Sequence, residues 1–307
     1  MSTLMKKLEF KKIQAEDYKK LKGYFLLRKN KSCDSMFLNY YMWADLYNTQ
    51  YSICDRALIW LMNRDGEYFS EMPMCLEDDL YNALENLKNY YKYELNRRLI
   101  INEADEEAVR YLINYKDEYV IKELLDNRDY IYDYKELTHL EGRKFHDKKN
   151  HINIFINNYR GRYEYRLLSS KDKEDVFKFI EFWIKNKKVC SVELCSEIIG
   201  IKNVFNNLDK LNVKVAGVYI DNNLQAFTIG EYNKLERMAI IHVEKANPYI
   251  NGLYQFINQK FLENEFKEAL IVNREDDAGI KGIRRAKLSY NPIYFERKYR
   301  LELINNI

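Results

Sequence analysis

The sequence has few of the residues that interrupt regular structure, with only 3 prolines and 10 glycines among 307 residues. Its five cysteines include no Cys-x-x-Cys pair and its four histidines show no metal-ligand spacing, so we expect neither a disulfide framework nor a metal site. No apolar run approaches the ~20 residues that span a bilayer, and the first residues carry charges throughout instead of a secretory signal. These absences favour a cytoplasmic protein without a transmembrane segment.

The composition is that of a globular chain with a core. Hydrophobic residues make up 47% and charged residues 32%, and the length predicts one large or two medium domains. A formal net charge of +3 is too small to predict nucleic-acid binding by itself. Cations nevertheless cluster locally, most often as solvated faces, at residues 142–150, 281–287 and 296–300.

Hydrophobic periodicity gives the two halves a similar order of elements. In the first half we expect a hairpin over 56–72, a helix over 77–96, a strand over 97–102 and a helix over 104–115. In the second half we expect a helix (170–188), a hairpin (213–233), a strand (237–247), a helix (250–266), a strand (268–273), a short helix (278–290) and a closing strand (293–304).

This order resembles the acetyltransferase-like fold of the GNAT type, in which a mixed sheet opens into a cleft for an acyl donor. We therefore expect an α/β (α+β) protein with two GNAT-like domains, each a mixed and mostly antiparallel sheet flanked by helices. The expected domains are residues 1–145 and 146–307, and the second carries the main site motifs.

The stretch "NREDDAGIKGIRRAKLSYNP" (273–292) places acids, glycines and cations in succession. In a helix over 278–290, Lys287 and Arg284 share the face that Ile280 and Ile283 turn inward. A cation on an apolar face is costly unless paired. Two interpretations stay open: an internal ion pair with Glu275 or Asp276, or a site for a ligand carboxylate, phosphate or developing oxyanion.

The glycines of this stretch add to the second interpretation. Gly279 and Gly282 lie at the expected start of the helix, where unsatisfied N–H groups favour an anion and glycine permits close approach of a ligand. Asn273 and Glu275 lie at the end of a strand, the edge at which open α/β sheets place ligands.

The strand over 237–247 offers another candidate. Strict alternation puts Ile240, His242 and Glu244 on one face, so Glu244 is either a site residue, a satisfied core carboxylate or a solvated strand end. His242 has no evident Ser or Cys partner and is expected to be structural.

One test of the enzyme class uses the stretch "YINGLY" (249–254). GNAT acetyltransferases carry Arg/Gln-x-x-Gly-x-Gly/Ala there, and their backbone amides bind the pyrophosphate of coenzyme A. Gly252 fits, but Tyr249 and Tyr254 replace the first and last residues. This departure argues against coenzyme A.

Three stretches together resemble the C-terminal domain of phosphatidylglycerol lysyltransferase and its stand-alone relatives, over roughly residues 25–305. They are "LTHLEGRKFHDKKNHINIF" (137–155), "HVEKANPYINGLYQFINQKF" (242–261) and the stretch 273–292. The resemblance implies a tandem GNAT-like fold related to the Fem peptidyltransferases, with aminoacyl-tRNA as donor, no cofactor and no metal.

The resemblance places family motif residues at Arg143, Lys144, Lys148 and Asn150 and at Asn273, Glu275, Gly279, Gly282, Arg284 and Lys287. The residue roles that follow are our hypothesis about the chemistry. Lys287, Arg284 and Glu244 would be catalytic, with the two cations on a terminal phosphate or oxyanion and Glu244 taking the proton of the acceptor. The substrate-binding residues would be Asn273, Glu275, Asp276, Gly279, Gly282 and Asn247, with an acid receiving the ammonium group of the donor. The acceptor end of the tRNA would be tracked by Arg143, Lys144, Lys148 and Asn150.

Several alternatives stay open at the level of sequence. The true lipid synthases carry a multi-span membrane region that this sequence lacks, so the acceptor is a lipid headgroup at a membrane surface, a cell-wall precursor or a soluble molecule. The chain could instead be a coenzyme A-dependent N-acyltransferase, or a non-catalytic module that binds an amino acid, a peptide or RNA.

Overall fold

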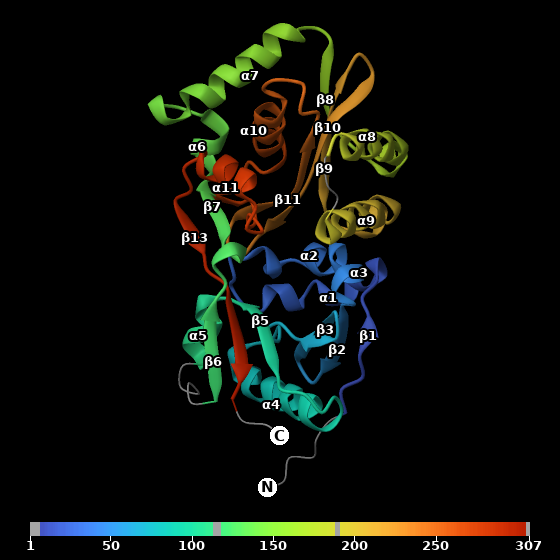
Figure 1. Cartoon of the computed structure of the whole chain (residues 1–307), viewed down its shortest axis with the longest axis vertical. Helices are drawn as coiled ribbons and strands as arrows, with labels where there is room; N and C mark the ends of the chain where they lie inside the picture. Colours follow the sequence, from blue (N-terminus) through green and yellow to red (C-terminus); the bar gives the residue numbers. More distant parts are fainter. Residues whose placement is uncertain (1–6, 113–117, 188–190, 305–307) are drawn as a thin grey trace. The chain divides into compact units, whose positions relative to one another are not determined.

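The chain folds into two compact units. In the computed structural model, which describes residues 7–112, 118–187 and 191–304, unit 1 consists of Met1–Arg128 with Glu296–Ile307, and unit 2 of Asp129–Phe295 (Figure 1). The expected boundary near 145 differs from this division for a physical reason. Residues 129–145 lie in unit 2 because their strand pairs there, and the last strand lies in unit 1 because its partners do.

Unit 1 contains two antiparallel sheets. The first has the order β1-β2-β3-β4, formed by Lys11–Lys12, Gln50–Cys54, Ala57–Arg64 and Glu67–Phe69. The second has the order β5-β14-β6, formed by Ile100–Ala104, Tyr299–Leu303 and Tyr119–Glu123. The helices are α1 Tyr18–Leu21, α2 Phe37–Met42, α3 Ala44–Tyr47, α4 Glu77–Tyr93 and α5 Glu106–Leu112.

The core of unit 1 forms where the apolar stripe of α4 meets the strands. Leu80, Leu84, Leu87 and Tyr91 recur at helical spacing and are all buried, as the sequence predicts. They pack in one cluster with side chains of β3, β5 and β14. The hairpin β3–β4 turns at Asp65 and Gly66, both with positive φ, at the Asp-Gly pair on which its prediction rests.

Unit 2 is built on one seven-stranded sheet with the order β13-β7-β12-β11-β10-β9-β8. These strands are Tyr294–Glu296, Asp129–Asp133, Ile271–Asn273, Met238–Ala246, Asn223–Asn233, Lys214–Ile220 and Tyr163–Leu167. Of the pairs whose register the structure defines, only β11 and β12 run parallel among the described residues. The sheet is therefore mixed and mostly antiparallel, as expected.

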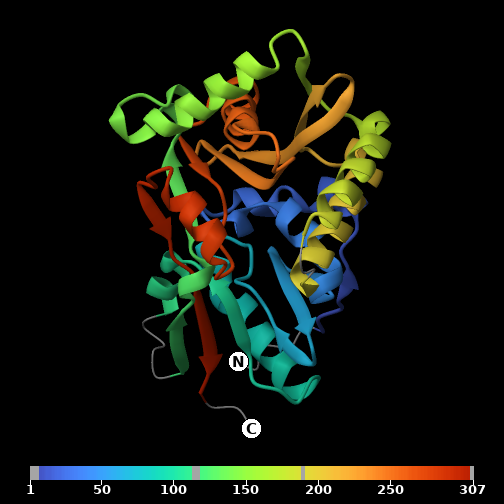
Figure 2. The same cartoon turned by 45° about the horizontal axis from the view of Figure 1, so that its top comes forward.

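Helices cover both faces of this sheet. They are α6 Tyr134–His139, α7 His146–Asn158, α8 Lys173–Lys185, α9 Val192–Asn206, α10 Leu253–Glu265 and α11 Lys281–Leu288. The sheet lies between α10 on one side and the pair α8–α9 on the other (Figure 1). Helix α7 lies across α10 (Figure 2). The elements predicted for the second half occur in the predicted order, but the prediction lacks helix α9 between α8 and β9. The strand expected over 293–304 is two strands, β13 and β14, in different sheets.

Cysteine chemistry departs from expectation at one position. Cys33, Cys54 and Cys75 are buried and form no disulfide, but Cys195 is disulfide-bonded.

Candidate functional site

The loop after β12 is held by its own side chains. Asn273 is fully buried, donates to Asp129 Oδ2 at 2.8 Å and accepts the N–H of Glu275 at 2.6 Å. The loop then turns through three residues with left-handed φ: Glu275 (56°), Ala278 (48°) and Gly279 (71°). Left-handed φ is unusual for residues other than glycine, so these bonds fix a backbone path that the chain would not adopt unaided.

Lys287 fixes the same loop from α11. Its Nζ donates to the carbonyl oxygens of Arg274 at 2.5 Å, of Glu275 at 3.1 Å and of Asp276. Burial lowers the pKa of Lys287 below its usual value. The predicted inward orientation of Lys287 is confirmed, and its three protons are all directed at backbone oxygens.

The apolar part of the prediction for α11 is wrong. Ile280 is 52% exposed and Ile283 is 40% exposed, and α11 has no buried residue. The helix is attached through the long side chains of its cations, so the isoleucines need not turn inward.

Arg284 pairs with an acid that the sequence reasoning did not select. Its Nε and Nη2 donate to the two oxygens of Asp277 at 2.8 and 2.7 Å, and the hydroxyl of Tyr130 donates to the same carboxylate. Although burial opposes it, the hydrogen bonds from Arg284 and Tyr130 hold the pKa of Asp277 below its usual value. The ion-pair interpretation is therefore correct in kind for Arg284, and Asp277 is a partner that the sequence did not single out.

Glu244 pairs with Arg274 across the end of the sheet. One carboxylate oxygen accepts from Arg274 Nη2 at 3.2 Å and the other from Asn258 of α10 at 2.9 Å. The Arg274 guanidinium also lies over the rings of Tyr290 (4.8 Å) and Tyr132 (5.9 Å). Both charged side chains are almost buried, with 13% and 12% exposed. Glu244 is therefore a satisfied carboxylate in this state.

A β-bulge explains how Glu244 reaches α10. Val243 pairs with Ile229 and Ile241 with Gly230, so His242 is the extra residue on β11. A bulge reverses the alternation of the side chains beyond it. The prediction that His242 and Glu244 share a face is consequently wrong.

His242 lies between two acids. Its Nδ1 is 2.7 Å from Glu275 Oε1, and its Nε2 is 3.3 Å from Glu231 Oε2. Although burial opposes protonation, the neighbouring carboxylates of Glu231 and Glu275 raise the pKa of His242 to about 9. A buried imidazolium thus links β10, β11 and the loop after β12.

The stretch 137–155, which contains the start of α7, contacts the stretch 273–292, which contains α11. Lys148 Nζ donates to Ser289 Oγ at 2.6 Å and lies 4.4 Å from the centre of the Tyr290 ring. Burial and the nearby charge of Arg274 lower its pKa. Two stretches separated by more than 100 residues therefore form one polar region.

The other cations and amides of the first motif are exposed. Lys144 forms an ion pair with Glu136, with Nζ–Oε distances of 2.7 Å. Arg143 and Asn150 are also exposed, and they flank the first turn of α7. Arg143 and Lys144 are thus both exposed at this end of unit 2.

Asn247 and Gly252 have local structural roles, whereas Gly282 has none that packing shows. Asn247 caps the turn after β11, accepting the N–H of Tyr249 at 3.0 Å and donating to Gln225 at 2.8 Å. Gly252 has φ +82°, and a Cβ there would lie 1.9 Å from the carbonyl oxygen of His151 on α7. At Gly282 a Cβ would meet nothing within 4 Å, so packing does not require glycine there.

Sequence reasoning missed Arg274, Asp277 and Tyr130. Asp277 belongs to the acidic run of the stretch 273–292, and Arg274 lies between the selected residues Asn273 and Glu275. The sequence pattern therefore identified the stretch but did not distinguish these two residues within it. Tyr130 carried no signal, because its strand β7 lies between β12 and β13, both more than 130 residues later in the chain.

The described residues contain neither a metal-binding cluster nor a membrane-spanning helix. Within residues 7–112, 118–187 and 191–304, no group of three or more His, Cys, Asp or Glu side chains could hold a metal ion. No helix in the same ranges is long and apolar enough to cross a membrane.

Known proteins share this fold over nearly the whole chain. A conserved protein of unknown function from Bacteroides thetaiotaomicron superposes with a TM-score of 0.85 at 26% identity, covering 97% of this chain and 100% of that one. The L-PGS structure from Bacillus licheniformis gives 0.67 at 13% identity, covering 96% and 94%. The FemX structure gives 0.64 at 8% identity, covering 97% and 98%. The expected fold class is confirmed by these likenesses.

Comparison of sequences gives one relative and one family. An uncharacterized protein of Mycoplasmoides gallisepticum is 24% identical over 176 residues, which is 57% of this chain and 56% of that protein. The chain thus spans about half the length of this curated relative. The family described as "Phosphatidylglycerol lysyltransferase, C-terminal" matches residues 25–302. The chain therefore belongs to the family of phosphatidylglycerol lysyltransferase C-terminal domains.

Proposed function

We propose that this chain moves an aminoacyl group from aminoacyl-tRNA to an amine or hydroxyl acceptor. Family and fold point to an aminoacyltransferase of the lysyltransferase or Fem kind, or to an acyltransferase of the GNAT kind. Two observations carry the narrower proposal. The family match over 25–302 contains the stretches 137–155 and 273–292, and these two stretches meet at Lys148 and Ser289.

The proposed chemistry needs neither a metal nor a covalent intermediate, because an aminoacyl ester is already activated. The acceptor adds to the ester carbonyl, and the ribose oxygen of the tRNA leaves. Positioning and charge stabilisation can then supply the rate enhancement. In the proposal, Asp276 and Glu275 receive the ammonium group of the donor, and Glu244 takes the proton of the acceptor.

Lys287 and Arg284 have positioning roles in this proposal. Lys287 donates to three carbonyl groups and Arg284 to Asp277, so both hold the loop that carries Glu275 and Asp276. A loop with three left-handed residues depends on such support. Loss of either cation should therefore misplace the acids that bind the donor.

Arg143, Lys144 and Lys148 would contact the phosphates of the acceptor end. Such contacts release counterions, so binding should weaken steeply with salt. Lys148, half-buried over Tyr290, would be the link between the tRNA backbone and the polar region around Arg274.

Coenzyme A is not the proposed donor. In the turn where GNAT acetyltransferases bind pyrophosphate, Tyr249 is 73% exposed and Tyr254 accepts a hydrogen bond from Trp183 Nε1 at 3.3 Å. The close approach to His151 gives Gly252 a packing reason that involves no ligand.

The test is filter retention of purified protein with a pool of charged, radiolabelled tRNAs at several salt concentrations. Wild type should retain one aminoacyl-tRNA, and Arg143→Ala should weaken retention and reduce the salt slope by about 1. The matched control is Arg160→Ala, since Arg160 is an exposed arginine just beyond the other end of α7, a helix of about 20 Å.

Two outcomes would contradict the proposal. One is absence of retention across the whole tRNA pool at low salt. Binding of coenzyme A in calorimetry would then support coenzyme A as the donor in place of aminoacyl-tRNA. The other is equal loss in Arg143→Ala and Arg160→Ala, which would reduce the binding to non-specific attraction of a basic surface. Retention without transfer to any acceptor would favour a non-catalytic RNA-binding module.

A further inference from the structure

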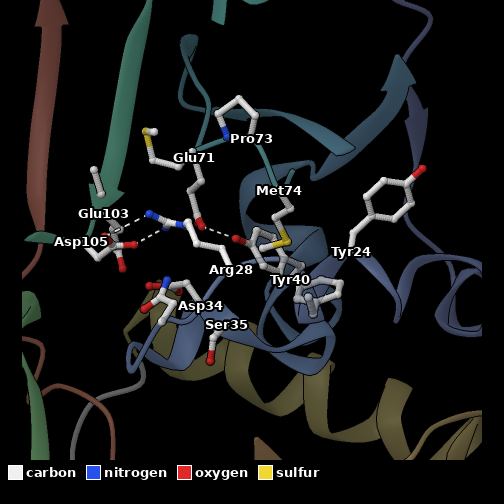
Figure 3. Close-up of a pocket in the computed structure, with 14 residues that line it drawn as sticks. Tyr24, Arg28, Asp34, Ser35, Tyr40, Glu71, Pro73, Met74, Glu103 and Asp105 are labelled. Atoms are coloured by element: carbon white, nitrogen blue, oxygen red, sulfur yellow. Dashed lines mark hydrogen bonds and ion pairs between the residues drawn. The ribbon is translucent and has the colours of Figure 1, made fainter. Parts of the chain in front are cut away.

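Unit 1 contains a polar cavity that belongs to none of the motifs above. Figure 3 shows its side chains, with Asp34 and Ser35 on one side and Glu71, Pro73 and Met74 on the other. Every lining residue lies in unit 1. The lining is Tyr24, Phe25, Arg28, Asn30, Asp34, Ser35, Tyr40, Glu71, Met72, Pro73, Met74, Glu103, Ala104 and Asp105.

Acidic groups outnumber cations around this cavity. Four carboxyl groups line it, those of Asp34, Glu71, Glu103 and Asp105, whereas the only lining cation is Arg28. Arg28 is committed to Asp105 through two hydrogen bonds, one of 3.2 Å and one shorter. With the nearby Lys298 included, four carboxyl groups surround two cations, so ionisation of Glu71 leaves the surroundings of the cavity negative.

One ammonium group of the chain already lies among these acids. Lys298 has no exposed surface, and its Nζ is 2.8 Å from Asp34 Oδ2, 2.9 Å from Glu103 Oε2 and 3.3 Å from Cys33 Sγ. Such a burial is tolerated only where carboxylates repay the loss of hydration. The neighbourhood thus already holds one lysine amine between two carboxylates.

Among the described residues, Arg28 pairs with Asp105, and Lys298 pairs with Asp34 and Glu103. Neither cation forms an ion pair with Glu71, the fourth acid of the lining. Glu71 accepts a hydrogen bond from the hydroxyl of Tyr40, whose ring is stacked on Trp60 at 3.9 Å and so is fixed in place. Burial, then the charges of Asp34 and Glu103, raise the pKa of Glu71 well above its usual value, while Tyr40 and Lys298 act in the opposite direction. The carboxyl group keeps its proton at pH values where an exposed glutamate has lost it.

We propose that this cavity binds a primary alkylammonium ion, with the charged head among Glu71, Asp34 and the Tyr40 hydroxyl and the methylene stem against Met72, Pro73 and Met74. The apolar wall suits an aliphatic stem, and the rings of Tyr24 and Phe25 add faces that attract cations. The described residues contain no group of three metal ligands, so the site fits an organic cation better than a metal ion. The proposal does not rest on the proposed function.

Binding should release a proton. The ligand arrives as RNH3⁺ and keeps its three protons, while Glu71 gives its own proton to solvent and becomes the counter-ion. Below the pKa of Glu71 in the free protein, affinity should therefore rise about tenfold per pH unit and then level off.

The experiment is isothermal calorimetry of the full chain with n-butylammonium across pH 6 to 9, in buffers of different ionisation enthalpy. Wild type should bind with release of a proton at pH values below the pKa of Glu71. Glu71→Gln should lose at least tenfold in affinity together with the pH dependence. Tyr40→Phe removes a hydrogen bond that stabilises the Glu71 carboxylate, so its affinity profile should move to higher pH.

Matched controls separate the site from general effects. Glu94→Gln makes the same substitution at the exposed end of α4 and should bind like wild type. n-Butanol and n-butyrate carry the same stem without the cation and should bind more weakly.

Three results would overturn the proposal. They are unchanged binding by Glu71→Gln, equal binding of n-butanol, and absence of butylammonium binding by folded wild type. If Glu71→Gln fails to fold, the pH profile of butylammonium affinity in Tyr40→Phe tests the proposal alone. A profile that does not move to higher pH would then overturn it. Failure here leaves aminoacyl-tRNA retention by unit 2 unaffected, so the two proposals fail separately.

Discussion

Replacing His242 with Gln should remove the pH dependence that His242 gives to the free energy of unfolding of unit 2. His242 is buried between Glu231 and Glu275, and its pKa is raised from 6.5 to about 9. A group with a raised pKa in the folded state contributes stability that is fully present below its unfolded pKa of 6.5. That contribution is lost as pH rises towards about 9.

The magnitude follows from the two pKa values. The difference between 6.5 and about 9 corresponds to about 3 kcal/mol of preferential stabilisation of the imidazolium. The Gln variant retains the shape and one hydrogen-bonding group but leaves two buried carboxylates without their cation. The variant should therefore be less stable than wild type by about 3 kcal/mol near pH 6, and this difference should shrink to a few tenths by pH 9.

The assay is urea unfolding of the full chain at pH values from 6 to 9, for wild type, His242→Gln and the control His139→Gln. His139 is an exposed histidine at the end of α6, so its substitution should leave the profile of wild type unchanged. NMR titration of the His242 ring should give a midpoint near 9. A stability difference that does not change with pH, or a ring that titrates near 6.5, would refute the charge assignment.

Further predictions concern the glycines and the loop lysine. Gly252→Ala should destabilise the chain by at least 2 kcal/mol in urea unfolding, because the added Cβ would meet the His151 carbonyl oxygen at 1.9 Å and φ is +82°. Gly282→Ala meets open space and should be neutral or stabilising by up to about 1 kcal/mol; loss of aminoacyl-tRNA retention without loss of stability would show that a ligand needs this space. Lys287→Met leaves the carbonyl groups of residues 274–276 without their donor and should cost about 2 to 4 kcal/mol. A stable Lys287→Met protein with normal retention would contradict the positioning role.

The elements that the sequence predicts are those with local causes. The hairpin β9–β10 turns at Asp221 and Asn222, both with left-handed φ, as the Asp-Asn-Asn run predicts. The stripe of α8 is another case, because Val176, Phe179, Ile180 and Trp183 are all buried. Short-range patterns determine these elements, so no knowledge of distant partners is needed.

The elements that it misplaces depend on partners far along the chain. Strand β14 lies between β5 and β6, and β7 lies beside β12, although nothing in either segment specifies the partner. The same limit applies to the site. The bulge at His242 depends on the register between β10 and β11, and it decides whether Glu244 faces α10. Periodicity gives the spacing of residues but not the register of strands.

The most direct test of the central claim compares charged with uncharged tRNA. The tRNA that wild type retains should be bound when aminoacylated, and it should be released at least tenfold more readily after the ester is hydrolysed, because Glu275 and Asp276 would lose the ammonium group that they bind. A chain that retains charged and uncharged tRNA equally, or retains neither, would contradict the claim that aminoacyl-tRNA is the donor.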